Sequence, residues 1–420
     1  NSSGVGRSAL LSQQLFFDSA YSHNWRYAAD QKWIRTSFKK LRGGADFKYR
    51  RAHCALIDPP GHDRLSGGWL VQSFPVFSIL IGGKHMTTKR KNWMVCVLAA
   101  VFLAASFLMC VFLPKGEYSD SERRKLAAPP ELSADTIFNG RFMSESETYV
   151  QDHFPFRDQF RTLKALSAAC LFQRKDNNGI YVFEGSAAAM EYPMDEASLS
   201  RAASRFRYLY QKYLDDSNKV YLSIIPDKNC YLAEQSGHLS IDYSLLEEQL
   251  LQQTGFADYI SISDLLESGD YYRTDVHWRQ EQITDVAERL AQAMGATLSK
   301  DYKENLLERD FYGVYCGQSA LPLAPDSLYY LTNDAIENCT VYDFQNNRAG
   351  QVYDFGRAMG KDPYELFLSG PLSLLTMENP QAQAGRELIL FRDSFGSSIA
   401  PLLISGYSKI TLVDIRYIHP

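Results

Sequence analysis

The chain has 420 residues, a length typical of about two or three domains, and its 45% hydrophobic and 13% aromatic content suffices for a packed core. The net charge of −5 averages two unlike parts, because residues 86–420 carry 44 acidic against 32 basic side chains. Such an acidic body repels phosphate backbones, and the chain has no P-loop, paired CxxC or HExxH motif, which argues against a nucleic-acid partner and these phosphate and metal sites.

Residues 1–85 are basic, with 12 Lys and Arg against 5 Asp and no Glu. They show no helical or strand periodicity, and Met86 opens a run typical of a protein start. We predict that residues 1–85 are a disordered or spurious extension. The alternative is a genuine basic cytoplasmic tail.

A membrane anchor is predicted at residues 93–113, which form an uncharged apolar run of 21 residues. About 20 apolar residues in a helix cross the hydrocarbon core. Lys89, Arg90 and Lys91 precede the run, which places the N-terminal end in the cytoplasm by the positive-inside rule. Residues 86–114 are therefore a cytoplasmic stub and single-pass anchor, and the rest of the chain lies outside the cytoplasm. A cleaved signal peptide is the alternative, but its apolar region is shorter.

The region after the anchor begins with a polar, Pro-containing stalk and a helical lead-in at residues 115–165. Pro155 is expected to interrupt the helical pattern, and His153 to pack at a helix end. Residues 166–420 then alternate short apolar runs with amphipathic ones. Strands are predicted at 180–183, 220–225, 259–263, 387–391 and 410–413, and helices at 197–214, 245–253, 280–294 and from 399. This alternation predicts an α/β layered domain with a largely parallel sheet, in which residues 340–385 are an insertion or irregular.

Four cysteines lie in the exported part. Export permits disulfides, and Cys316 with Cys339 is one candidate pair. Buried free thiols are the equal alternative.

The first phrase that can carry chemistry is YYRTDVHW, at residues 271–278. Asp275 stands two residues before His277, so its carboxylate can orient one imidazole nitrogen and leave the other free to act as a base. The alternative is a helix cap for Asp275 and a packed imidazole beside Trp278. Taken alone, the spacing favours that alternative.

The second phrase is LFRDSFGSS, at residues 390–398. A buried-type strand ends just before Ser394 and a helix follows, and α/β sheets place their sites at the carboxyl ends of strands. The backbone N–H groups of Phe395 and Gly396 are candidate oxyanion donors. The alternative is that Ser394 caps the helix. The two phrases together supply a serine nucleophile, a base and a group that orients the base.

Four other residues are weaker candidates for binding substrate. Arg273, Lys228 and Arg416 are cations suited to a donor or glycan, although surface ion pairing is their commoner role. Tyr272, with Tyr271 and Trp278, is a candidate sugar-stacking surface, against core packing. A metal-dependent hydrolase is disfavoured because no second His stands at useful spacing, so no metal or cofactor is expected.

The ordered set of phrases resembles SGNH-like proteins of the DHHW family and the related alginate O-acetyltransferase proteins. Beside the two phrases above, RRKLAAPPELS, YVQDHFPFRDQF, IPDK and VDIRYI carry this resemblance, which covers residues 118–420. It implies an SGNH-hydrolase-like three-layer sandwich, with Asp275, His277 and Ser394 as a catalytic triad in permuted order. Val276 departs from the pattern, since the family name implies His there. Family members also continue beyond the equivalent of Pro420, which implies an incomplete sheet here.

The resemblance implies a membrane-anchored extracytoplasmic serine enzyme, an O-acetyltransferase or acetylesterase acting on exported or cell-surface polysaccharide. Its partners would be an acyl donor, a polysaccharide acceptor and a membrane acyl-transfer or export protein. The alternative is a non-catalytic anchored glycan-binding or envelope protein with a degenerate triad.

Overall fold

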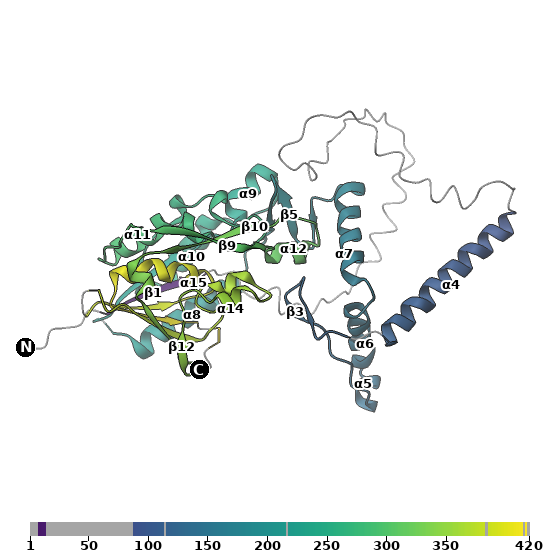
Figure 1. Ribbon diagram of the computed structural model, residues 1–420, viewed down its shortest axis with the longest axis horizontal. Coiled ribbons are helices and arrows are strands. Elements are labelled where there is room, and N and C mark those ends of the chain that lie inside the picture. The colour runs from purple at the N-terminus through teal and green to yellow at the C-terminus, as the bar shows by residue number, and fades with distance from the viewer. Residues whose placement is uncertain are drawn as a thin grey trace, which may run out of the picture. The chain divides into compact units, whose positions relative to one another are not determined.

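The computed structural model describes residues 7–13, 87–112, 115–215, 217–382, 385–414 and 416–417 (Figure 1). The chain divides into two compact units. The first comprises Asn1–Gly43, Asp120–Arg123 and Ala165–Pro420, and the second comprises Gly44–Ser119 and Arg124–Lys164. The prediction that residues 1–85 form an extension concerns segments that are mostly outside the described residues.

The second unit holds the predicted anchor as helix α4, Thr88–Phe112. Its stretch Thr88–Cys110 is long and apolar enough to cross a membrane, while the orientation stays a prediction. The other elements are β2 (Tyr118–Ser119), β3 (Arg124–Lys125), α5 (Ala134–Phe138), α6 (Arg141–Asp152) and α7 (Arg157–Leu166). The helical pattern is interrupted at Pro155 as expected. His153 caps α6, and its ring packs at a tilt against that of Tyr149, with 4.4 Å between the ring centroids.

The first unit is built on an eight-stranded sheet with the order β12-β11-β13-β15-β14-β1-β7-β8. The strands are β1 (Arg7–Gln13), β7 (Lys219–Ile224), β8 (Asp258–Tyr259), β11 (Thr340–Asp343), β12 (Arg348–Gly350), β13 (Leu374–Glu378), β14 (Glu387–Phe391) and β15 (Lys409–Val413). No strand was expected near β1, which lies parallel between β14 and β7.

The expectation of a largely parallel sheet is wrong for the described residues taken together. The pairings from β15 through β14, β1 and β7 to β8 are parallel, but those joining β12, β11, β13 and β15 are antiparallel. Three smaller sheets are antiparallel throughout: β4-β5-β6, β9-β10 and β2-β3. Segment 340–385, which the sequence left unplaced, supplies β11–β13. The fold of the described residues is therefore mixed α/β.

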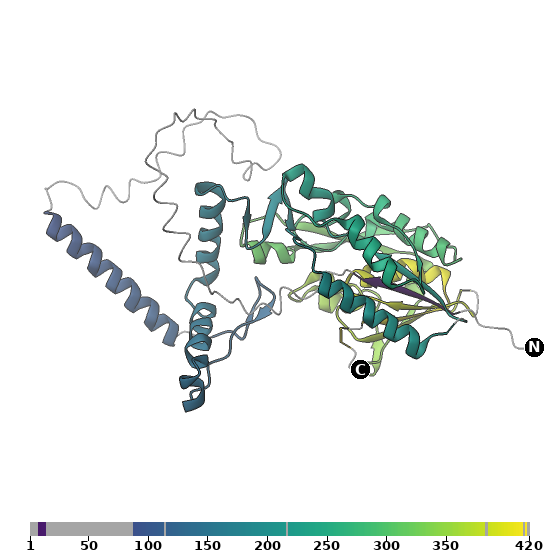
Figure 2. The ribbon, with the colours of Figure 1, turned by 180° about the vertical axis from the view of Figure 1, so that it is seen from behind.

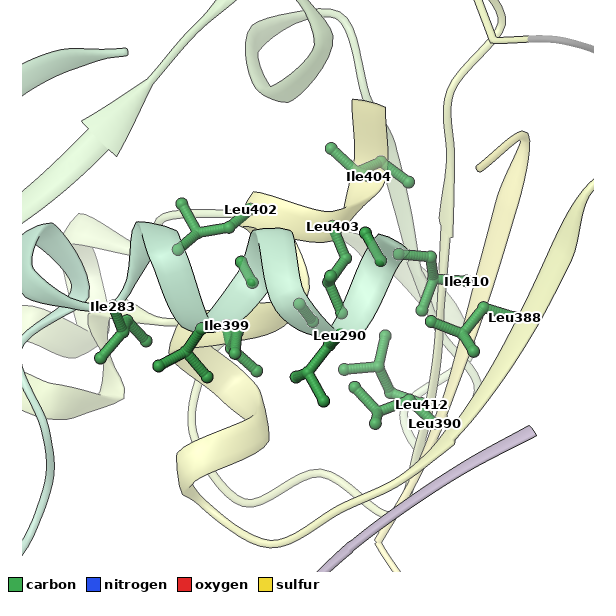
Figure 3. Close-up of a cluster of buried hydrophobic side chains, with 14 of the residues drawn as sticks. Ile283, Leu290, Leu388, Leu390, Ile399, Leu402, Leu403, Ile404, Ile410 and Leu412 are labelled. Atoms are coloured by element: carbon green, nitrogen blue, oxygen red, sulfur yellow. The ribbon is translucent and has the colours of Figure 1, made fainter. Parts of the chain in front are cut away.

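Helices pack on both faces of the large sheet (Figures 1 and 2). The faces are set by the alternation along β7, because Val220 and Leu222 pack with the helices α8 (Glu196–Tyr213) and α10 (Tyr243–Gln253), while Tyr221 lies in the opposite cluster. That opposite cluster contains α11 (Thr284–Ala293) and α15 (Phe395–Leu403). In Figure 3, Leu290 of α11 and Leu403 of α15 meet strand residues such as Leu388, Leu390, Ile410 and Leu412.

The first unit also contains a further set of elements. They are β4 (Asp176–Asn177), β5 (Ile180–Phe183), β6 (Ser186–Ala189), α9 (Asn229–Ser236), β9 (Lys303–Phe311), α12 (Val314–Ser319), β10 (Asp326–Thr332), α13 (Asp334–Glu337) and α14 (Phe355–Ala358). A π-helical turn lies at η1 (Ser167–Leu171), and 3₁₀ turns lie at η2 (Ser263–Leu265), η3 (Ser268–Asp270), η4 (Gln280–Gln282), η5 (Pro363–Leu366) and η6 (Ile404–Gly406).

The predicted strands β5 and β14 have the expected bounds. Strand β15 begins one residue earlier than predicted, and α8 and β7 begin and end one residue earlier. The hairpin of β9 and β10 was not predicted. Cys316 and Cys339 are free thiols, so the candidate disulfide between them is not formed.

Candidate active site

A tight loop between buried aromatic residues presents the first predicted phrase. Tyr271 and Trp278 form an antiparallel bridge, and the N–H of Tyr272 donates to the carbonyl of His277 at 3.0 Å. Trp278 is fully buried. The two ends of the loop are thus closed by packing and hydrogen bonds, and Asp275 and His277 lie on the segment between them.

The structure brings the three predicted residues into one hydrogen-bonded chain. The Asp275 Oδ1 atom lies 2.6 Å from His277 Nδ1, and His277 Nε2 lies 2.7 Å from Ser394 Oγ. An ionised carboxylate only accepts hydrogen bonds, so Nδ1 carries the proton and Nε2 accepts from the serine hydroxyl. In this tautomer the imidazole is set to remove the Ser394 proton.

The charge of Asp275 is stabilised although the side chain is fully buried. Burial by itself raises a carboxyl pKa, but His277, Arg123 and the backbone N–H of Val314 outweigh it and hold the pKa of Asp275 below its ordinary value. The Val314 N–H donates to Asp275 Oδ2 at 2.8 Å. Asp275 is therefore ionised at neutral pH.

Two buried charged residues hold the loop backbone. The Nζ of Lys228 donates to the carbonyls of Tyr272, Arg273 and Asp275 at 2.6, 3.2 and 3.0 Å. The carboxylate of Asp326 accepts hydrogen bonds from the backbone N–H groups of Arg273 and Thr274 at 2.9 and 2.8 Å. The loop thus has fixed partners for both its carbonyls and its N–H groups, which limits the positions that Asp275 can adopt.

A glycine permits the close approach of α12 to this loop. A Cβ atom at Gly313 would lie 2.2 Å from the carbonyl oxygen of Thr274 and 2.5 Å from Cβ of Asp275. The Gly313 N–H also donates to Thr274 Oγ1 at 2.9 Å. Any larger residue would push Val314, the donor to Asp275, away from the carboxylate.

The orientation of the His277 ring is set by aromatic packing. Its ring stacks on Tyr364 at a centroid distance of 3.9 Å, and Phe395 approaches from another side at 5.0 Å. Ser398 fixes these neighbours, because its Oγ accepts from Tyr364 Oη and from Trp278 Nε1, both at 2.8 Å. The hydroxyl also donates to the carbonyl of Phe395 at 3.1 Å.

Replacing Ser398 with alanine is expected to destabilise the protein by about 2 kcal/mol, because two buried donors lose their acceptor. The measurement is urea denaturation followed by Trp fluorescence. Ser204→Ala is the matched control, since Ser204 is exposed on α8. Equal unfolding free energies for the two variants would show that the Ser398 hydroxyl gives no net stabilisation.

Ser394 occupies the predicted position, between the end of β14 and the start of α15. The turn is stabilised by Asp393, whose Oδ1 accepts from the N–H of Phe395 at 2.9 Å. This bond overturns the prediction of Phe395 as an oxyanion donor, because its N–H is already used. Gly396 lies where a Cβ atom would be 2.5 Å from Cβ of Arg392, and its N–H stays a candidate donor.

A buried guanidinium supports the same turn. Arg392 Nη1 donates to Ser397 Oγ at 2.6 Å and lies 3.9 Å from Asp414 Oδ2. Arg416 also holds Asp414, through Nε at 2.8 Å and Nη2 at 2.6 Å. The two arginines thus share one fully buried carboxylate at the end of β15.

The structure changes the roles predicted for the weaker candidates. Tyr272 is fully buried and packs edge-on against Phe311, so it offers no face to a sugar. Lys228 is buried with its ammonium given to three carbonyls, and Arg416 is paired with Asp414, so neither is placed to bind substrate. The side chain of Arg273 is 55% exposed beside Asp326, and its role stays a prediction.

Several residues that support the site were not predicted. These are Arg123, Gly313, Asp326, Tyr364 and Ser398. The signal for two of them was present, because RRKLAAPPELS contains Arg123 and FRDSFGSS contains Ser398. The others lie in segments between 303 and 366, where the sequence showed no motif.

No family model matches the chain, and no curated protein matches it. The solved structures that match the chain include the following three. A DHHW family protein from Eubacterium siraeum is 20% identical, with 58% of this chain and 85% of that chain covered and a TM-score of 0.46. Bacillus cereus PatB1 is 15% identical, with 57% and 88% covered and a TM-score of 0.40. The O-acetyltransferase domain of Pseudomonas putida AlgJ is 18% identical, with 38% and 67% covered and a TM-score of 0.29. The solved structures that this chain resembles thus include a member of the DHHW family, which its sequence motifs also resemble.

Proposed function

We propose that this protein is a serine acyl-ester enzyme in which Ser394 is the nucleophile, His277 the general base and Asp275 the carboxylate that orients the base. The observation that carries the proposal is the unbroken chain of hydrogen bonds from Asp275 through His277 to Ser394, at 2.6 and 2.7 Å. A serine hydroxyl is a weak nucleophile unless a base removes its proton, and this geometry supplies the base in the required tautomer.

The proposed reaction has two steps. His277 Nε2 takes the Ser394 proton while Oγ bonds to the carbonyl carbon of an acyl ester, and the imidazolium then protonates the departing alcohol. An acceptor hydroxyl, from a sugar or from water, loses its proton to His277 and attacks the acyl carbon. The bond from that carbon to Ser394 Oγ then breaks, and the imidazolium returns the proton to Oγ. The Gly396 N–H is the proposed backbone donor to the oxyanion in both steps.

We further propose an acetyl group as the acyl group and an exported or cell-surface polysaccharide as the acceptor. This rests on the motif resemblance of residues 118–420 to the DHHW and alginate O-acetyltransferase proteins. In keeping with that resemblance, the first unit is assigned to the SGNH-like three-layer folds, and the helices on both sheet faces support this assignment.

Helix α4 would anchor the enzyme in the cell membrane, with the basic residues 89–91 in the cytoplasm and the proposed active site outside it. The acyl donor would then have to be available outside the cytoplasm, which is why a membrane acyl-transfer or export partner is part of the proposal.

The test is covalent labelling of the full-length protein in detergent with phenylmethylsulfonyl fluoride, mapped by mass spectrometry of peptides. A serine activated by a base reacts with this reagent, whereas an ordinary surface serine does not. We expect labelling at Ser394, no labelling in Ser394→Ala, and normal labelling in Ser204→Ala. Turnover of p-nitrophenyl acetate should follow the same pattern.

A folded wild-type protein that is neither labelled at Ser394 nor active on the ester would contradict the proposal. That result would favour the alternative, an anchored glycan-binding protein with a degenerate triad. For a protein that is active, addition of oligosaccharide acceptors separates transfer from hydrolysis, because only transfer moves the acetyl group to the sugar.

A further inference from the structure

Besides its partner His277, the carboxylate of Asp275 has a cationic neighbour that comes from a distant part of the chain. The Nη1 atom of Arg123 lies 3.6 Å from Asp275 Oδ2. Arg123 stands eleven residues after the end of α4, in the turn at residues 120–123 between β2 and β3. The turn belongs to the first compact unit, together with Asp275.

We propose that Arg123 is a positioning residue for the Asp275–His277 pair, so that the segment following the membrane-spanning helix completes the active site. The inference rests on the proposed serine acyl chemistry. It goes further in assigning a role to the turn Asp120–Arg123, which lies outside the motifs that carry Asp275, His277 and Ser394.

The guanidinium is itself held in place by several groups. Its Nη1 lies 2.8 Å from Asp362 Oδ2, and its Nη2 donates to the carbonyl of Tyr312 at 2.7 Å. The guanidinium carbon lies 6.0 Å from the ring centroid of Phe311, and the side chain is only 13% exposed. A fork with fixed partners on several sides has little freedom to leave Asp275.

Arg123 is linked to the imidazole by a second route. Asp362, its close ion-pair partner, caps η5 by accepting from the N–H of Tyr364 at 3.1 Å. The ring of Tyr364 stacks on His277 at 3.9 Å. The Arg123 guanidinium therefore contacts Asp275, which orients the base, and Asp362, which caps the turn that holds Tyr364 against the His277 ring.

The turn that carries Arg123 fits closely against the rest of the first unit. A Cβ atom at Gly317 of α12 would lie 1.5 Å from the carbonyl oxygen of Ser121, so only glycine allows this approach. At the start of the turn, Asp120 Oδ1 lies 2.7 Å from Lys361 Nζ. Helix α12 also begins at Val314, whose N–H donates to Asp275 Oδ2. Arg123 and α12 thus reach the same carboxylate oxygen.

The expected effect of losing Arg123 follows from charge. Without the guanidinium, the negative charges of buried Asp275 and partly exposed Asp362 repel one another with less compensation, and the Asp275–His277 pair holds a proton more readily. The base is then available only at higher pH. The other titratable groups around the guanidinium are Glu365 and Cys316, both of which feel its charge.

The experiment compares Arg123→Gln with Arg124→Gln in the full-length protein, across a pH series. Arg124 is the matched control because it is the adjacent arginine and pairs with Asp152 instead, at 2.6 Å. The readouts are the rate of Ser394 sulfonylation and kcat and KM for p-nitrophenyl acetate. We expect Arg123→Gln to lower the rate and kcat about tenfold, with KM unchanged and the midpoint of the pH profile moved upward. Arg123→Lys should recover part of the loss, since it keeps the charge but not the fork.

A second variant leaves Arg123 intact but displaces its turn. Gly317→Ala must move Ser121, and we expect the same upward movement of the pH midpoint. Circular dichroism and thermal melting check that each variant is folded. An Arg123→Gln protein with the rate and pH midpoint of Arg124→Gln would overturn this inference while Ser394 labelling upheld the proposed function. If Arg123→Gln does not fold, a folded Gly317→Ala protein with an unchanged pH midpoint overturns it. A wild-type protein without labelling at Ser394 would overturn both.

Discussion

Asp275→Asn is expected to lower kcat for ester turnover by about 10⁴-fold while the protein remains folded. The reason is the set of donors around the carboxylate. Asp275 Oδ1 accepts from His277 Nδ1, and Oδ2 accepts from the Val314 N–H beside Arg123. An asparagine has one oxygen and one NH₂ group, so it can satisfy only one of these two sides.

Each orientation of the asparagine has a different cost. With its NH₂ toward His277, it favours the tautomer in which Nε2 carries the proton, and that nitrogen cannot accept from Ser394. With its NH₂ toward Val314 and Arg123, two sets of donors face one another in a buried site. The first orientation avoids the clash and removes the base, which is why activity is lost.

The measurement is kcat for p-nitrophenyl acetate, with Asp285→Asn as the control because Asp285 is exposed. The pH dependence of stability should also change. The pKa of Asp275 is lower in the folded protein than in the unfolded chain. Its ionisation therefore stabilises the fold at pH values above its pKa in the unfolded chain. This contribution is lost as the pH falls through the folded pKa, and Asp275→Asn should lack it. Wild-type kcat in a folded Asp275→Asn protein would refute the assigned role.

Lys228→Met is expected to destabilise the protein by about 3 kcal/mol and to abolish most of the activity. The methionine leaves the carbonyls of Tyr272, Arg273 and Asp275 buried without their donor. It also removes the cation beside Asp275 and Asp326. The loop that carries His277 then loses its fixed position, so kcat falls together with stability.

Thermal denaturation measures the first effect, and a fall in Tm of roughly 10 °C corresponds to it. Lys300→Met is the control, because Lys300 is exposed in its pair with Glu288. Burial lowers the pKa of Lys228 to about 7, although Asp275, Asp326 and Asp227 oppose the shift. Between pH 7 and the ordinary lysine pKa, the unfolded chain binds more protons, so wild-type stability should rise with pH in this window. The same rise in Lys228→Met would show that Lys228 is not its source.

Local periodicity in the sequence was enough to predict several helices and strands. The apolar runs of β7 and β14 and the amphipathic pattern of α8 gave their positions within a residue, because a short apolar run predicts a buried strand and one apolar face predicts a helix that packs on the core. The sequence also placed Asp275 and His277 on one loop and Ser394 at a strand-to-helix turn. These inferences needed only residue order and backbone chemistry.

Residue order does not reveal which side chains come into contact in the folded protein. Ser394 and His277 are 117 residues apart, yet their atoms lie 2.7 Å from one another. Lysine is usually a surface residue, but Lys228 lies buried under the loop. Tyrosine is often found in sugar-binding surfaces, but Tyr272 lies in the core. Arg123 reaches Asp275 across 152 residues. Long-range contacts of this kind depend on how irregular loops and short hairpins are closed by their neighbours, and no local periodicity records that packing.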